Sequence, residues 1–223
     1  MTDTKLHIIP LGDQAAQVNL STEDEAIRFA ARVRAANADW LIDVVQAYTS
    51  VAVFFEIKTI RYLRIVEELQ RISTYDVPED ALTVRRHEIP CCYEWQQDMA
   101  RIVEHTGLDS DAIIDLHCET EYTVYAIGFC PGFPYLGYLP EALSGVPRLP
   151  SPRVRVEAGS VALTGRQTGI YTEDRPGGWN ILGKTPLQLV DVADEYFPLR
   201  TGDKIRFRKM DKEEYQHLLR KRL

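Results

Sequence analysis

The spacing of hydrophobic and polar residues divides the first 88 residues into short strands and amphipathic helices. Alternation with a period of two is typical of strands with one buried face, whereas a period of about 3.6 is typical of helices. The predicted strands are residues 7–9, 16–20, two within 41–56 and 84–89, and the predicted helices are one from Ser21, its expected N-cap, to Val33 and one over 60–72. This order predicts a small α+β sandwich, and the segment contains no recognisable catalytic constellation.

The second half of the chain begins with helical spacing and then changes to a β pattern. Residues 95–105 have helical spacing and are followed by Gly107, a typical helix stop, while Asp109 is a suitable N-cap for a second short helix. From Glu121 onward, short apolar runs are separated by glycine and proline. This pattern favours a β-barrel or β-sandwich over a parallel α/β sheet.

Composition narrows the range of functions. The chain of 223 residues carries 26 basic and 33 acidic residues, which gives a net charge of −7 and a pI near 5.3. Such an acidic chain offers no positive face for nucleic acid. No apolar run approaches the roughly 18–20 residues that cross a bilayer, and the N-terminus lacks a signal-peptide core, so we expect a cytoplasmic protein without membrane association. The four cysteines lack the paired spacing of zinc sites, so no metal is expected.

One segment matches the phosphate-binding P-loop pattern letter for letter, Gly-Trp-Asn-Ile-Leu-Gly-Lys-Thr at 178–185. That pattern binds phosphate only when a helix starts after the lysine, because the helix N-terminus and its backbone N–H groups hold the anion. Here Pro186 follows directly, and residues 187–192 alternate as a strand would. We therefore expect no nucleotide site in this chain.

Glycine, proline, arginine and aromatic residues are concentrated in one block between residues 128 and 180. Two interpretations are open. The glycines and prolines turn the corners of a small barrel, or they build a concave site beside aromatic walls. In the second interpretation Arg153, Arg166, Gln167 and Tyr171 are the polar groups, and arginine and glutamine suit a carboxylate or amide ligand through forked hydrogen bonds.

The same block carries a resemblance to a known family. Its segments read Gly-Phe-x-Pro-Gly-Phe-x-Tyr-Leu-Gly at 128–137, Ser-Pro-Arg at 151–153, Ala-Gly-Ser-Val at 158–161, Gly-x-Gln-Thr-Gly-Ile-Tyr at 165–171, Pro-Gly-Gly-Trp-x-x-x-Gly-x-Thr-Pro at 176–186 and Thr-Gly-Asp-Lys-Ile-Arg-Phe at 201–207. In this order they are similar to the family of allophanate hydrolase subunit 1, the 5-oxoprolinase B subunit and the KipI kinase inhibitor. One position departs from that pattern, because Glu157 stands where the family usually has proline.

The resemblance implies an α+β protein with a small N-terminal α/β sandwich domain over residues 1–88 and a cyclophilin-like β-barrel domain with a C-terminal helix over 89–223. It implies the B subunit of an ATP-dependent 5-oxoprolinase, a hydrolase which converts 5-oxoproline to glutamate. Such a chain is active only with a paralogous second subunit, of the allophanate hydrolase subunit 2 type, and a third 5-oxoprolinase protein. ATP is then a co-substrate of the complex, and no cofactor is expected on this chain.

Two alternative functions stay open at this point. One is a KipI-type inhibitor, whose partner is a sensor histidine kinase. Its exposed aromatic residues would contact a helical bundle, and they are Phe129, Phe133, Tyr135 and Trp179. The other is subunit 1 of an allophanate hydrolase or of a urea carboxylase-type carboxyltransferase.

The enzyme-subunit hypothesis assigns roles to particular residues. We expect His117, Arg153 and Tyr171 to be catalytic, by positioning and polarising a small lactam or amide. His117 is the only histidine near the signature segments, and a neutral imidazole can act as acid or base at about pH 7, although an ordinary packed histidine is the alternative. The expected substrate-binding residues are Phe129, Phe133, Arg166, Gln167, Thr168 and Trp179.

Overall fold

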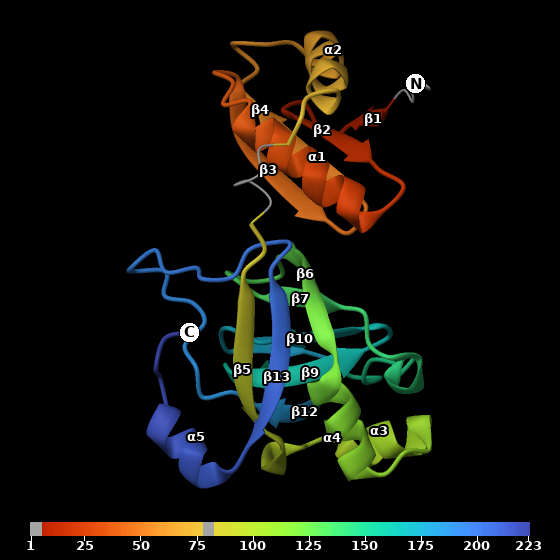
Figure 1. The fold of residues 1–223 in the computed structure, drawn as a ribbon, viewed down its shortest axis with the longest axis vertical. Coiled ribbons are helices and arrows are strands. Elements are labelled where there is room, and N and C mark those ends of the chain that lie inside the picture. The colour runs from red at the N-terminus through yellow and green to blue at the C-terminus, as the bar shows by residue number, and fades with distance from the viewer. Residues whose placement is uncertain (1–5, 78–82) are drawn as a thin grey trace. The chain divides into compact units, whose positions relative to one another are not determined.

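The computed structural model describes residues 6–77 and 83–223, and the chain forms two compact units, Met1–Val84 and Arg85–Leu223 (Figure 1). Among the described residues, no helix is long and apolar enough to span a membrane.

The described part of the first unit is a four-stranded antiparallel sheet packed against two helices. The elements are β1 (His7–Pro10), β2 (Ala15–Asn19), α1 (Glu23–Ala35), β3 (Leu41–Ala47), β4 (Ser50–Phe55) and α2 (Tyr62–Ser73), with strand order β1-β2-β4-β3. Alternate residues of β4 are buried, and they join the apolar faces of both helices in one core, which includes Phe29, Val53 and Leu69. The predicted small α/β sandwich is confirmed.

Helix α1 begins one residue later than the sequence predicts. Thr22, not Ser21, is its N-cap, and the Thr22 hydroxyl accepts a hydrogen bond from the Glu25 backbone N–H at 3.2 Å. The Glu25 carboxylate in turn accepts from the Ser21 backbone N–H at 2.9 Å. This reciprocal arrangement satisfies two backbone donors, so Ser21 takes part through its backbone rather than through its side chain.

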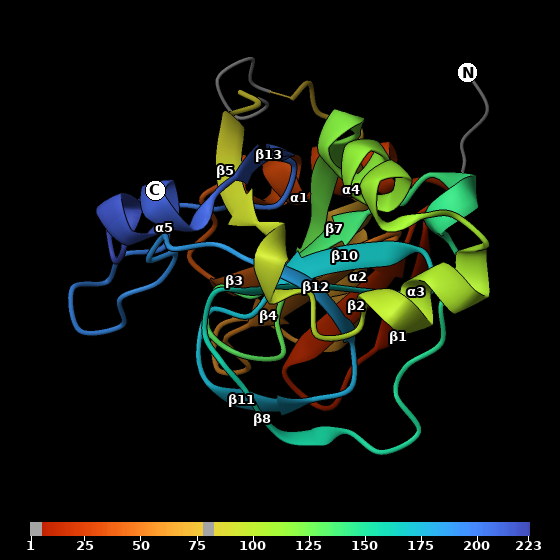
Figure 2. The same cartoon turned by 90° about the horizontal axis from the view of Figure 1, so that it is seen from below.

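The second unit is built around a closed β-barrel of seven strands. They are β5 (Arg86–Cys92), β6 (Glu121–Ile127), β7 (Pro134–Gly137), β9 (Ser160–Thr164), β10 (Gln167–Ile170), β12 (Asn180–Lys184) and β13 (Lys204–Met210). Their order is β6-β13-β5-β12-β9-β10-β7, and β6 pairs with β7 to close the barrel. Figure 2 shows a separate two-stranded ribbon, formed by β8 (Arg153–Val156) and β11 (Arg175–Gly177). The predicted barrel is confirmed.

Helices and short turns complete the second unit. They are the 3₁₀ turns η2 (Tyr93–Trp95) and η3 (Glu141–Leu143) and the helices α3 (Met99–Thr106), α4 (Ser110–Glu119) and α5 (Lys212–Leu218). Gly107 ends α3 with a φ of 72°, and Asp109 caps α4 by accepting a hydrogen bond from the Ala112 N–H at 2.8 Å. Both ends lie where the sequence predicts them, because helix caps depend on neighbouring residues.

Two details differ from the sequence predictions. The predicted boundary between residues 88 and 89 falls inside β5, and the strand expected at 84–89 belongs to the barrel, where β5 pairs in parallel with β13. Residues 187–192 form only isolated bridges, such as that between Gln188 and Arg222, rather than a strand. The alternation there reflects the packing of Leu187 and Leu189 against the barrel core, not a hydrogen-bonded ladder.

Candidate functional site

Phe133 lies at the centre of an aromatic cluster, which consists of Phe129, Phe133, Tyr135, Tyr171 and Trp179. The centroid of its ring lies 5.5 Å from that of Phe129, 5.0 Å from Tyr135, 5.3 Å from Tyr171 and 5.5 Å from Trp179. All four contacts are edge-to-face, which is favourable because the positive edge of one ring meets the negative face of another. Signature segments that are distant in sequence therefore meet at this cluster.

One member of the cluster is displayed at the surface. Phe133 and Tyr171 each keep 2% of their surface exposed, whereas Phe129 is 59% exposed and has a φ of 67°. A left-handed backbone at a bulky residue is strained, and such strain often persists at binding sites. Phe129 thus exposes its aromatic ring to solvent at the edge of the cluster.

The hydroxyl of Tyr171 approaches the backbone of the β8–β11 ribbon. A Cβ atom at Gly177 would lie 2.2 Å from the Tyr171 hydroxyl oxygen, so a residue larger than glycine cannot fit without displacing the tyrosine. Burial raises the pKa of Tyr171, while a hydrogen bond with the Trp179 backbone and the positive charges of Arg148 and Arg153 lower it by smaller amounts. The phenol is therefore neutral at about pH 7 and can donate a hydrogen bond to a carbonyl oxygen.

Arg153 is held by a buried carboxylate, that of Asp98. The Nη2 atom of Arg153 donates to Asp98 Oδ1 at 2.7 Å, and Asp98 Oδ2 accepts from the Ile181 backbone N–H at 2.7 Å. The Arg153 side chain is 28% exposed, but its Nη1 atom is buried and has no hydrogen-bond partner among the described residues. A guanidinium with one nitrogen engaged and another unsatisfied suits the oxygen of a carboxylate or amide.

His117 lies in the barrel core, with its ring stacked on Phe207 at 4.4 Å between centroids. Its Nδ1 atom lies 2.7 Å from the Tyr93 hydroxyl, and its Nε2 atom lies 3.0 Å from Thr168 Oγ1. Since Thr168 Oγ1 donates to the Ala162 carbonyl at 3.1 Å, it accepts from the Nε2–H of His117, and Nδ1 accepts from Tyr93. Burial lowers the pKa of His117 to about 3. This neutral imidazole with both nitrogens engaged matches the packed-histidine alternative, and its catalytic role stays a prediction.

Arg166 and Gln167 lie on the same turn and strand but do not join these groups through a described contact. The Arg166 guanidinium stacks over the Tyr138 ring at 4.3 Å from its centroid. Gln167 starts β10, next to Thr168, and successive strand residues point to opposite faces. Because Thr168 is fully buried beside His117, Gln167 faces the other side of the strand.

The structure therefore brings seven of the nine predicted site residues into two groups, which Arg166 and Gln167 do not join. Phe129, Phe133, Tyr171 and Trp179 form one cluster that lies within reach of the charge of Arg153, whereas His117 and Thr168 lie together in the barrel core. The sequence predicted Tyr135 only as a contact residue of the kinase-inhibitor alternative, and it predicted no role for Arg148 or Asp98. Asp98 could not be found from the sequence, because it meets Arg153 across 55 residues and belongs to no motif.

The segment that matches the P-loop pattern, residues 178–185, is part of the barrel. Residues 180–184 form the barrel strand β12, and no helix follows Lys184 in this described segment. The Lys184 ammonium pairs with the carboxylate of Glu157, and this hydrogen bond and ion pair lower the pKa of Glu157. The glutamate that departs from the family's proline thus has a partner on β12.

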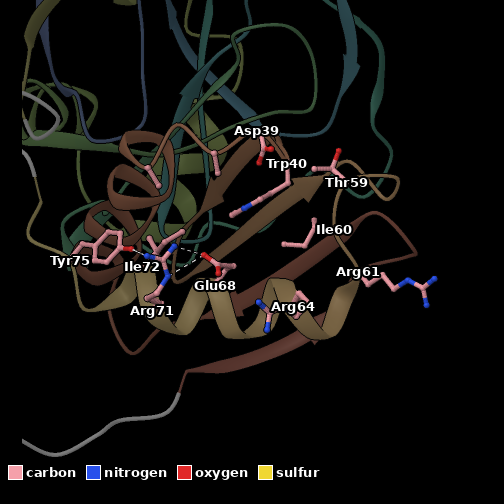
Figure 3. A pocket seen from close by; sticks show the side chains of 12 residues that line it. Asp39, Trp40, Thr59, Ile60, Arg61, Arg64, Glu68, Arg71, Ile72 and Tyr75 are labelled. Carbon is pink, nitrogen blue, oxygen red and sulfur yellow. Dashed lines mark hydrogen bonds and ion pairs between the residues drawn. The ribbon is translucent and has the colours of Figure 1, made fainter.

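A pocket of about 800 Å³ lies in the first unit, between α2 and residues 36–40 (Figure 3). Trp40 lies along one wall, and α2 forms the other. Two of its three arginines are paired, since Arg64 bonds to Glu67 at 2.6 Å and Arg71 bonds to Glu68 and Tyr75. Because the charges of Arg64 and Arg71 are compensated and none of the family's signature segments reaches this pocket, the aromatic cluster and Arg153 are the better candidate site.

Comparison with known proteins shows that this closed barrel belongs to a carboxyltransferase-type module. The family model described as "Carboxyltransferase domain, subdomain C and D" matches residues 6–199, so the chain belongs to this family. The resemblance recognised in the sequence is confirmed by curated relatives that are named as the B subunit of 5-oxoprolinase. That of Bacillus subtilis (strain 168) is 34% identical over 234 residues, with 95% of each chain covered. That of Escherichia coli O157:H7 is 42% identical over 147 residues, which are 64% of this chain and 67% of the relative.

Solved structures share the same architecture. The crystal structure of TTHA0988 has a TM-score of 0.77 and 32% identity over 89% of this chain, and this chain spans 40% of that longer one. The urea amidolyase of K. lactis has a TM-score of 0.70 at 14% identity, over 96% of this chain and 15% of its own length, and so shares the fold alone.

Proposed function

We propose that this chain is the B subunit of an ATP-dependent 5-oxoprolinase, which converts 5-oxoproline to glutamate together with a paralogous second subunit and a third protein. The observation that carries the proposal is the similarity along the whole chain to the Bacillus subtilis protein named as a 5-oxoprolinase B subunit, 34% identical with 95% of both chains covered. ATP is a co-substrate of the complex in this proposal, and it binds on another subunit.

The site offers the groups that a small lactam carboxylate needs. Arg153 binds the carboxylate of 5-oxoproline, because its Nη1 atom is an unsatisfied donor. The neutral phenol of Tyr171 donates a hydrogen bond to the lactam oxygen and polarises the carbonyl. Phe129, Phe133 and Trp179 form the apolar wall against the ring of the substrate.

The test is reconstitution with 5-oxoproline and ATP, in which glutamate and ADP are measured for this chain alone and with the second and third subunits. We expect glutamate only from the full mixture. Arg153→Ala should lower kcat/KM by about 10- to 100-fold, because it removes a charged hydrogen bond to the substrate. Arg155→Ala is the matched control, since Arg155 lies on the same strand and pairs with Asp174 in an exposed position, with 69% and 45% of the side chains accessible.

A different result would overturn the proposal. If the full mixture forms no glutamate while this chain suppresses the autophosphorylation of a sensor histidine kinase, the 5-oxoprolinase proposal is wrong and the inhibitor function replaces it.

A further inference from the structure

Asp98 occupies a helix N-cap position without capping the helix. It precedes α3, where an aspartate usually accepts a hydrogen bond from an N–H group of the first turn. Its side chain makes no such bond. Both carboxylate oxygens are instead used by groups from other segments, Oδ1 by Arg153 and Oδ2 by the Ile181 backbone, each at 2.7 Å. The carboxylate of Asp98 thus accepts hydrogen bonds from β8 and β12 and from no N–H group of its own helix.

Asp98 is itself fixed relative to the barrel. Its backbone N–H donates to the Ile181 carbonyl at 3.0 Å, while its Oδ2 accepts from the Ile181 N–H, so one residue of β12 holds it by two bonds. Arg101, in the first turn of α3, adds a bond from Nε to Asn180 Oδ1 at 3.1 Å. The start of α3 is therefore tied to β12 immediately after Trp179, a member of the aromatic cluster.

The burial of Asp98 favours a fixed orientation of the Arg153 guanidinium. Asp98 is 8% exposed, and charge-assisted hydrogen bonds are stronger and better oriented where water is largely excluded. The bond uses Nη2 of Arg153, and Nη1 is left buried without a partner among the described residues. A buried donor with no acceptor in a folded protein calls for an explanation, and a ligand oxygen supplies one.

We propose that Asp98 is a positioning residue for Arg153, which holds Nη2 so that Nη1 is presented to a carboxylate ligand beside the aromatic cluster. The proposal rests on the proposed function for the identity of that ligand, 5-oxoproline. Asp98 does not contact the ligand, and its effect passes through the guanidinium of Arg153.

The first test is kinetic and uses the reconstituted three-subunit mixture. In Asp98→Asn, one of the two donors, Arg153 or Ile181, meets an amide NH₂ group instead of an oxygen, so the guanidinium is no longer held. We expect KM for 5-oxoproline to rise about ten-fold with kcat within about two-fold, because the carboxylate is bound equally in the ground and transition states. Adding Asp98→Asn to Arg153→Ala should raise KM no further, since the residue acts only through Arg153.

Asp174→Asn is the matched control. Asp174 also accepts from one arginine, Arg155, and from one backbone N–H, that of Ala158 at 2.8 Å, but it is exposed, and the described contacts include none between it and Arg153. Its variant should keep the KM of the unmodified protein. A purely structural role for Asp98 would appear as a loss of thermal stability with an equal further loss of activity in the Arg153→Ala background, and that result would overturn the proposal.

The second test does not depend on turnover. Arginine side-chain NMR of the ¹⁵N-labelled chain, in complex with unlabelled partner subunits, follows the Nε–H and Nη–H signals of Arg153. We expect protected Nη signals that shift on addition of 5-oxoproline in the unmodified chain and that broaden in Asp98→Asn. If the mixture makes no glutamate, the proposed function fails, and acetate then replaces 5-oxoproline as the carboxylate probe. Signals that are unchanged by Asp98→Asn, or unshifted by either carboxylate, would show that Asp98 does not position Arg153 for such a ligand.

Discussion

The Nε2 atom of His117 lies 3.0 Å from the Oγ1 atom of Thr168, and this hydrogen bond joins α4 to β10 inside the barrel. It is one link of a chain of polar groups that starts at the Tyr93 hydroxyl and ends at the Ala162 carbonyl. Because every member is buried or paired, removal of a single link leaves a buried donor or acceptor unsatisfied.

Thr168→Val tests this chain of polar groups directly. Valine has nearly the shape of threonine but offers no acceptor to the Nε2–H of His117. We expect the free energy of unfolding to fall by about 1–3 kcal/mol, the usual cost of an unsatisfied buried donor, as measured by urea denaturation of the protein. Thr168→Ser keeps the hydroxyl and isolates the effect of the lost methyl group. A valine variant as stable as the unmodified protein would show that the bond contributes nothing.

The depressed pKa of His117 predicts a pH dependence of stability. Its pKa is about 3 in the folded chain against 6.5 for an exposed histidine, so the unfolded state binds one more proton between these values. Stability therefore decreases as the pH falls from about 6.5 towards 3, by up to about 1.4 kcal/mol per pH unit from this group. His117→Gln, whose side chain does not titrate, should show a shallower decrease in unfolding experiments between roughly pH 7 and pH 5. Parallel slopes for the two proteins would contradict the assignment.

Gly177 and Gly178 provide a matched pair of substitutions. A Cβ atom at Gly177 would lie 2.2 Å from the Tyr171 hydroxyl oxygen, whereas one at Gly178 would lie 3.7 Å from its nearest neighbours, atoms of Pro152. We expect Gly177→Ala to displace Tyr171, to cost about 1–3 kcal/mol of stability and to lower activity, while Gly178→Ala stays close to the unmodified protein. Thermal melts and the 5-oxoproline assay measure both effects, and equal behaviour of the two variants would refute the close approach.

Alanine substitutions at Phe133 and Phe129 should have different effects on stability and on activity. Phe133 is buried among four aromatic rings, so Phe133→Ala should cost about 3–5 kcal/mol of unfolding free energy. Phe129 is 59% exposed, and Phe129→Ala should change stability by only about 0.5 kcal/mol. If Phe129 contacts the substrate or the second subunit, its alanine variant nevertheless lowers glutamate production by the full mixture. Unchanged production would remove Phe129 from the site.

Local features were predictable because they depend on residues close in sequence. The caps at Gly107 and Asp109, the two strands within residues 41–56 and the aromatic signature at 128–137 all follow from short-range rules. The resemblance to the carboxyltransferase family was also readable in the sequence, since its motifs occur in a definite order. Even at this level the N-cap of α1 was displaced by one residue, because Ser21 and Thr22 compete for the same role.

Hydrophobic patterns and family motifs were therefore enough to predict most helices and strands, the family and the barrel that the family implies, although the strand predicted over 187–192 does not form. Which polar groups meet depends on the folded chain. Asp98 meets Arg153 across 55 residues, and His117 meets Thr168 across 51. No local pattern encodes such pairs, because barrel closure brings together strands and helices that are far apart along the chain. Which side chains are buried also depends on the tertiary structure. His117 is buried in the barrel core with both ring nitrogens hydrogen-bonded, whereas the guanidinium of Arg153 keeps one unsatisfied donor.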